Sequence, residues 1–161
     1  MRQADALLDA LASTPADVTR AAARCDAEAG RARPAAEQWS AADILNHLVD
    51  VEQRYQARLR RIAEAERPTL ADIGPDEAHH DPHATCQELA VRLRDARQET
   101  LVFLRGLPVG GWARRAVHET LGDLRMDQVV RVLVEHDVAH LAQLVETRSR
   151  VATIPRGGNI A

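Results

Sequence analysis

Two histidines four residues apart, His136 and His140, have the residue type and the spacing to bind a metal ion. The run from Met126 to Thr147 is predicted to be a helix, and side chains at positions i and i+4 of a helix share one face. Two imidazoles placed in this way can both reach one divalent ion, at about 2.0–2.1 Å per nitrogen. Both fall on the apolar, core-facing stripe of the segment. Because buried imidazoles need polar partners, a metal ion is the leading candidate.

A third histidine, His47, falls on the core-facing stripe of another predicted helix, between Ile44 and Val51. Three neutral imidazoles with open positions for water are typical of a catalytic metal site. We therefore predict one divalent ion, zinc or nickel, bound by His47, His136 and His140. Counted from the predicted helix starts, His47 lies about 10 Å along its helix and the midpoint of the pair about 18 Å along the other. In a parallel pair of helices this offset is more than one turn, so the two helix ends must be staggered.

The elements that would position these histidines are helices, because β-branched runs and period-two stretches are nearly missing. Capping-box pairs open two of them, Ser40 with Asp43 and Thr85 with Glu88. The amphipathic segments are 2–13, with a second piece from Pro15 to about residue 25, then 40–66, 85–106 and 126–147. Four main amphipathic helices predict an all-α, antiparallel, up-and-down four-helix bundle. We assign it to residues 1–147 as one domain, with a C-terminal tail at 148–161.

Composition limits the function. The chain has 161 residues and a net charge of -3, so nothing suggests a basic surface for nucleic acid. It has neither a signal-peptide-like start nor a run of 18 apolar residues, so we expect a soluble cytoplasmic protein without a membrane partner. All 21 basic residues are arginine, which removes lysine as a Schiff-base nucleophile. Cys25 and Cys86 form no CxxC pair, so no zinc knuckle or dithiol redox motif is predicted.

Ligand histidines usually donate their second ring N–H to an acceptor, and Asp137, Gln143 and Glu52 are the candidates for this supporting role. Asp137 could equally be a solvated helix residue.

A second histidine cluster, His79, His80 and His83, lies near Cys86. Histidine-rich tracts can bind metals, but this one falls in a proline-broken loop whose ordering entropy opposes a fixed site. We interpret it as a solvated loop or the mouth of the pocket. We expect His118 to stabilise the loop before the last helix, with a place in the lining of the site as the alternative.

Two motifs resemble the DinB/YfiT-like superfamily of metalloenzymes, and together they span Trp39 to Leu144. The first is Trp-Ser, an acidic residue and His-Leu-x-Asp-x-Glu, matched by Trp39, Ser40, Asp43, His47, Leu48, Asp50 and Glu52. The second is His-x-x-x-Gly, a spacer and His-Asp-x-x-His-x-x-Gln, matched by His118, Gly122, His136, Asp137, His140 and Gln143. Asp43 replaces a commoner glutamate, and Glu119 stands where proline often follows the loop histidine. The resemblance implies a four-helix bundle with a three-histidine metal site.

The resemblance also implies a function. Characterised relatives include metal-dependent thiol S-transferases and isomerases that use low-molecular-weight thiols such as bacillithiol or mycothiol, and relatives are commonly homodimers. The metal would bind the sulfur of the cosubstrate, lower its pKa and deliver a thiolate to a small electrophile. Two alternatives stay open. One is a hydrolase in which Glu52, Asp50 or Glu135 helps a metal-activated water. The other is a non-enzymatic metal-binding stress or interaction protein.

Overall fold

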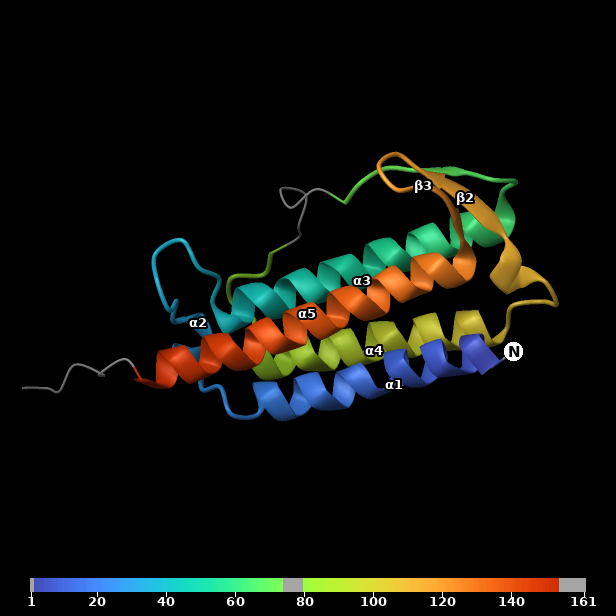
Figure 1. Cartoon of the computed structure of the whole chain (residues 1–161). Coiled ribbons are helices and arrows are strands. Elements are labelled where there is room, and N and C mark those ends of the chain that lie inside the picture. Colours follow the sequence, from blue (N-terminus) through green and yellow to red (C-terminus); the bar gives the residue numbers. More distant parts are fainter. Residues whose placement is uncertain (1, 74–79, 154–161) are drawn as a thin grey trace, which may run out of the picture.

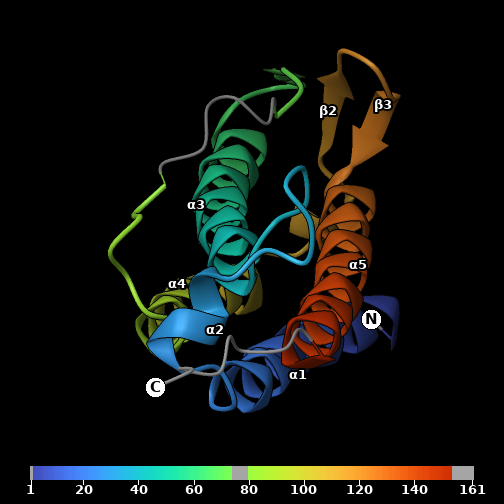
Figure 2. The ribbon, with the colours of Figure 1, turned by 90° about the vertical axis from the view of Figure 1, so that its left-hand side faces the viewer.

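Four long helices form the bundle in the computed structural model, which describes residues 2–73 and 80–153 (Figure 1). They are α1 (Arg2–Ala22), α3 (Ala41–Glu64), α4 (Cys86–Arg105) and α5 (Met126–Thr153). Helices α1 and α3 each pack against both α4 and α5, so the order around the bundle is α1, α4, α3, α5 (Figure 2). The prediction of an all-α four-helix bundle is confirmed.

The helix directions explain how the metal-binding segments meet. Helices α1 and α5 run in one direction, and α3 and α4 run in the other (Figure 1). The chain therefore reverses between α1 and α3 and between α4 and α5. Helix α3 and the next long helix, α4, run parallel, so the predicted up-and-down order is wrong for this pair. Helices α3 and α5 are antiparallel, and α5 extends past the start of α3, so the stagger expected for a parallel pair does not apply.

Both predicted capping boxes are confirmed. The Ser40 hydroxyl accepts the Asp43 N–H at 3.1 Å, and the Asp43 carboxylate accepts the Ser40 N–H at 2.9 Å. Thr85 and Glu88 exchange the same two bonds at 3.2 and 2.8 Å. These boxes fix the first residues of α3 and α4. At its far end α5 continues past Thr147 to Thr153 and takes in the first residues of the predicted tail.

Helix α1 is continuous through Pro15, where the sequence predicted two pieces. A proline inside a helix cannot bond the carbonyl four residues earlier, which here belongs to Leu11. The Leu11 carbonyl instead accepts a bond at 3.2 Å from the buried guanidinium of Arg97 on α4. The helix therefore persists because a side chain from a neighbouring helix replaces the missing backbone donor.

A small sheet, which the sequence did not predict, covers one end of the bundle. Its strands are β1 (Thr69–Leu70), β2 (Arg115–His118) and β3 (Gly122–Arg125), in the order β1-β2-β3. Strand β2 runs parallel to β1 and antiparallel to β3. Gly122 has a φ of 72°, which suits the turn before β3. Along β2, Ala116 and His118 are buried, so alternate side chains face inward.

The apolar core has two parts along the bundle axis. One contains the end of α1 and the start of α3 and α4 around Leu45 and Leu89, next to the five-residue helix α2 (Ala27–Arg31). The other lies under the sheet around Leu59, Leu104 and Leu133. No helix of the described ranges is long and apolar enough to cross a membrane.

Candidate metal centre

Three histidine side chains meet between α3 and α5 near the middle of the bundle. His47 comes from α3, and His136 and His140 come from adjacent turns of α5. One nitrogen from each ring can be chosen so that all three atoms lie within 4.8 Å of one another. The Nε2 atoms of His47 and His136 are 2.9 Å apart. Of the side chains in the described ranges, this is the group of histidines, cysteines and acids that could hold a metal ion.

Two rings of the triad, those of His47 and His136, are uncharged near neutral pH. Burial lowers the pKa of His47 to about 4, with a further contribution from the charge of His140. Burial likewise lowers the pKa of His136 to about 3, again with a contribution from His140. A metal ion binds the unprotonated imidazole nitrogen. The site therefore presents these two rings in the state that a metal requires.

Hydrogen bonding orients the third ring. The amide oxygen of Gln143 lies 2.8 Å from Nδ1 of His140. An amide oxygen only accepts, so Nδ1 of His140 carries the proton and its Nε2 is left as the metal-binding nitrogen. The buried Nδ1 of His136 has no hydrogen-bond partner in the structure. Three imidazole nitrogens, one from each ring, form a donor set that fits a divalent ion.

A cavity of about 370 Å³ lies on the sheet side of the triad and is lined by all three rings. Its other walls combine apolar and polar side chains. They are Val51, Tyr55, Arg58, Asp72, Ile73, His118, Thr120, Leu121 and Val132. The Arg58 guanidinium lies over the Tyr55 ring, 5.5 Å from its centroid, and donates to the Ala71 carbonyl. The sheet therefore closes one side of the space next to the three histidine rings.

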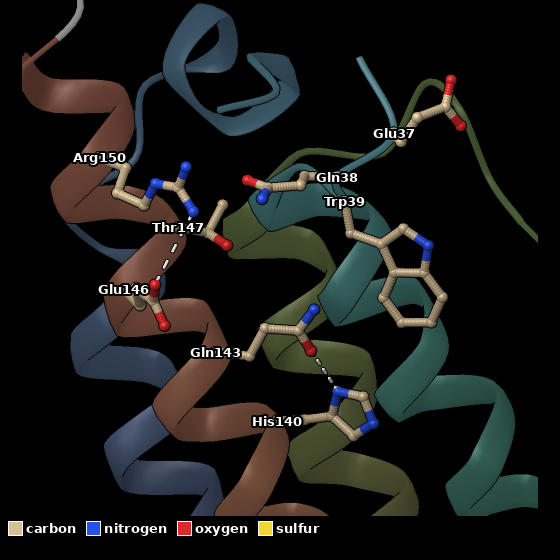
Figure 3. Close-up of a pocket in the computed structure, with 8 residues that line it drawn as sticks. All are labelled: Glu37, Gln38, Trp39, His140, Gln143, Glu146, Thr147 and Arg150. Atoms are coloured by element: carbon tan, nitrogen blue, oxygen red, sulfur yellow. Dashed lines mark hydrogen bonds and ion pairs between the residues drawn. The ribbon is translucent and has the colours of Figure 1, made fainter. Parts of the chain in front are cut away.

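A second cavity, of about 410 Å³, lies toward the C-terminal end of α5 and also contacts His140 (Figure 3). Figure 3 shows His140 and Gln143 on α5, with the Trp39 ring across from them. The Trp39 and His140 rings stack with centroids 6.0 Å apart and planes at 15°. The remaining lining is polar, from Glu37, Gln38, Glu146, Thr147 and Arg150. His140 thus lines both cavities, and the second is the more polar of the two.

A family model described as the DinB superfamily matches residues 10–144, which include the histidine triad. The chain belongs to the DinB superfamily. A comparison with curated protein sequences gave no match.

Among solved structures, the fold is similar to that of YfiT from Bacillus subtilis, which is described as a probable metal-dependent hydrolase with an unusual four-helix bundle topology. The TM-score is 0.83 at 18% sequence identity, over 94% of this chain and 89% of that chain. At this identity the similarity concerns the fold.

In this DinB-superfamily chain, two of the predicted supporting residues lie in a buried ionic cluster instead of against a ligand ring. Arg97, which is 1% exposed, donates to Glu52 at 2.9 and 2.6 Å and to Asp137 at 2.7 Å. Thr100 also donates to Glu52. Since Arg97 also bonds the Leu11 carbonyl, one guanidinium connects all four long helices. Gln143 is thus the predicted supporting residue that the structure places on a ligand histidine.

The remaining predicted acids lie elsewhere. Asp50 is paired with Arg54 at 2.9 Å, and Glu135 is exposed on α5. His118, on β2, accepts the backbone N–H groups of Thr120 and Leu121 at its Nδ1, as expected for a residue that stabilises the loop, and it also lines the cavity beside the triad.

The loop histidines lie apart from the triad. His80 and His83 are exposed, and Nε2 of His80 is 3.4 Å from the Asp43 carboxylate. His79 lies outside the described residues.

The two cysteines are far apart in the sequence but are neighbours in the fold. Cys25 follows α1 and Cys86 begins α4, both are buried, and their thiols share a hydrogen bond. That bond is the largest cause lowering the pKa of Cys25 to about 7. Only the tertiary contact between α1 and α4 brings them together, so sequence spacing carried no signal for it.

Proposed function

We propose that this protein is a metal-dependent enzyme that transfers a low-molecular-weight thiol to a small electrophilic substrate. His47, His136 and His140 would hold the ion, zinc or nickel. When bound, the ion would supply Lewis-acid chemistry that lowers the pKa of the thiol. The observation that carries the proposal is that two cavities of different character share His140. A transfer reaction needs room for two molecules beside one centre.

The residues around the triad have separate tasks. His47 and His136 stay neutral and available as ligands because burial lowers their pKa values. Gln143 fixes the ring of His140 by its 2.8 Å bond to Nδ1. Val51 and Val132 give the sheet-side cavity an apolar wall, which limits water near the reacting atoms.

An external nucleophile is consistent with the cavity walls. Among the residues that the structure describes, no cysteine, serine or lysine lines either cavity. Both cysteines are buried where α1 ends and α4 begins. A thiol cosubstrate therefore supplies a group that the two cavities lack.

A second candidate is metal-dependent hydrolysis, which is supported by the description of YfiT. Two of the three acids that could serve as a base are engaged elsewhere: Glu52 bonds Arg97, and Asp50 bonds Arg54. None of the three, Glu135 included, lines the sheet-side cavity. We therefore favour transfer of a thiol to an electrophile over hydrolysis.

We also propose that the protein acts in the cytoplasm as a homodimer on a small molecule. The net charge of -3 supports a partner other than nucleic acid. Light scattering at micromolar concentration tests the oligomeric state, and a monomer mass would contradict it.

The test of function uses protein purified without a histidine tag, first for metal content and then for turnover. When the protein, zinc or nickel and a thiol are all present, an electrophile should disappear faster than with the metal and the thiol alone. His136→Ala should remove that difference, whereas His83→Ala, at an exposed histidine outside both cavities, should not. Thiol-independent ester hydrolysis by the metal-loaded protein would favour the second candidate. Full metal loading without either activity would favour a non-enzymatic metal-binding protein.

A further inference from the structure

The β2–β3 hairpin places His118 beside the metal ligands. Alternation along β2 turns Ala116 and His118 inward, and His118 is 8% exposed. Its backbone is fixed from both sides, since it pairs with Leu70 of β1 and with Gly122 of β3. The side chain lines the same cavity as His47, His136 and His140. A buried, rigidly held imidazole therefore faces the space next to the proposed metal ion.

The hydrogen bonds of His118 determine its tautomer. Nδ1 of His118 lies 3.3 Å from the backbone nitrogen of Thr120 and 3.3 Å from that of Leu121. A backbone N–H can only donate, so Nδ1 must accept and carries no proton. The proton of the neutral ring is then on Nε2. His118 is a fixed N–H donor, and no lone pair on Nε2 is available to take up a proton.

This donor is not strongly engaged within the protein. Nε2 lies 3.5 Å from a carboxylate oxygen of Asp72, which is longer than a normal N–H···O hydrogen bond. The Asp72 side chain is 60% exposed and also accepts a bond from Thr120. Both His118 and Asp72 line the cavity. A ligand oxygen can therefore take over the N–H of His118 at little cost to the protein.

We propose that His118 is a further catalytic residue that donates its Nε2–H to a carbonyl oxygen of the electrophile, and that the electrophile is an α,β-unsaturated carbonyl compound. The proposal rests on the proposed thiol transfer. Its chemical basis is that conjugate addition moves negative charge onto a carbonyl oxygen. A positioned neutral N–H donor stabilises such an oxygen. Substitution at a saturated carbon bearing a halide creates no such charge.

The step balances without an oxidant or reductant. The thiol loses its proton to solvent, and its sulfur forms a bond to the β-carbon. The electron pair of the carbon–carbon double bond moves to give an enolate, whose oxygen accepts the hydrogen bond from Nε2 of His118. A proton from solvent then adds to the α-carbon. The product is the saturated thioether, and His118 keeps its proton throughout.

The first test requires no turnover. Nitrogen NMR of ¹⁵N-histidine-labelled protein, with His118 assigned by its loss in His118→Gln, should show a protonated Nε2 and an unprotonated Nδ1 from pH 7 to 9. Cyclohexanone, a saturated ketone that cannot react, should shift the Nε2–H signal. A proton on Nδ1, or no shift at saturating ketone, would overturn the assignment of His118 as the carbonyl donor.

The second test compares two electrophiles with zinc-loaded protein and 2-mercaptoethanol: cyclohex-2-enone, which has a carbonyl, and benzyl chloride, which has no oxygen. His118→Phe keeps a planar ring without the donor, so the preference for the enone should fall about 100-fold, the usual loss for one such donor. His118→Gln keeps an N–H donor and should retain most of the preference. An unchanged preference in His118→Phe would overturn the proposal.

Failure of the proposed function has a different signature, namely no thiol-dependent consumption of either electrophile by the wild-type protein. The NMR measurement still decides whether His118 binds a carbonyl in that case. Thermal unfolding of His118→Phe checks that the hairpin is intact. If that variant does not fold, His118→Gln and the wild-type ketone titration carry the test.

Discussion

The Nε2 atoms of His47 and His136 lie 2.9 Å apart, although the two residues are 89 positions apart in the chain. Neither ring is charged near neutral pH, so one nitrogen donates to the other when no ion is bound. A divalent ion would replace this single bond by a bond to each ring. The contact between α3 and α5 therefore brings the nitrogens of two proposed metal ligands together.

Gln143→Leu should weaken metal binding about 10- to 100-fold, because His140 loses the acceptor that fixes its tautomer. The measurement is competition with a chelator of known affinity. Gln143→Glu keeps an acceptor at the same position and serves as the matched control. Equal affinities for Gln143→Leu and the wild-type protein would show that the bond does not support the site.

The metal-free protein should lose stability as the pH falls below about 6.5. In the unfolded chain both histidines have a pKa near 6.5, whereas in the folded protein the pKa is about 4 for His47 and about 3 for His136. Between these values the unfolded state binds more protons, so the free energy of unfolding falls as the pH falls. Urea unfolding with a chelator at pH 7, 6, 5 and 4 measures this. His136→Phe should show a shallower pH dependence, and an unchanged slope would contradict the assignment.

Arg97→Met should destabilise the protein by about 3–5 kcal/mol, because Glu52 and Asp137 would remain buried without their shared cation. Arg20→Met is the control, since the side chain of Arg20 is 71% exposed and its pair with Asp17 should contribute at most about 1 kcal/mol. Urea unfolding gives both values. Similar losses for the two variants would mean that the buried cluster contributes little.

Gly30→Ala should lower the thermal stability even though Gly30 is in a helix. Alanine favours a helix over glycine by about 1 kcal/mol, but its Cβ would lie 2.8 Å from Sγ of Cys86. Overpacking of this kind costs about 1–3 kcal/mol. In a Cys86→Ala background the clash disappears, so the same change should be neutral or stabilising. Additive effects in the double variant would contradict this packing argument.

The features that the sequence predicted correctly depend on local patterns. Ser40 with Asp43 and Thr85 with Glu88 satisfy backbone groups within one turn, so they mark helix starts in any tertiary context. His136 and His140 share a face because of helix geometry alone. The prediction that His47 lies beside them depended on a second apolar stripe and on the family motifs.

The features that the sequence missed depend on contacts between distant segments. Pro15 stays inside α1 because Arg97, far away in the chain, bonds the Leu11 carbonyl. Strand β2 has four residues and gains its partners from β1 and β3, so its period-two pattern was too short to detect. Asp137 follows a ligand histidine but turns to Arg97, since the face of α5 that it occupies looks into the core.

The order of the helices around the bundle bears on how the chain folds during synthesis. Helix α1 leaves the ribosome before the other long helices, yet it packs against α4 and α5, which are made later. Its apolar residues Leu7, Leu11 and Val18 must stay uncovered, or be covered by other means, until those helices emerge. We therefore expect the newly made N-terminal half of this protein to bind chaperones. Truncation after α3 should give a fragment that aggregates.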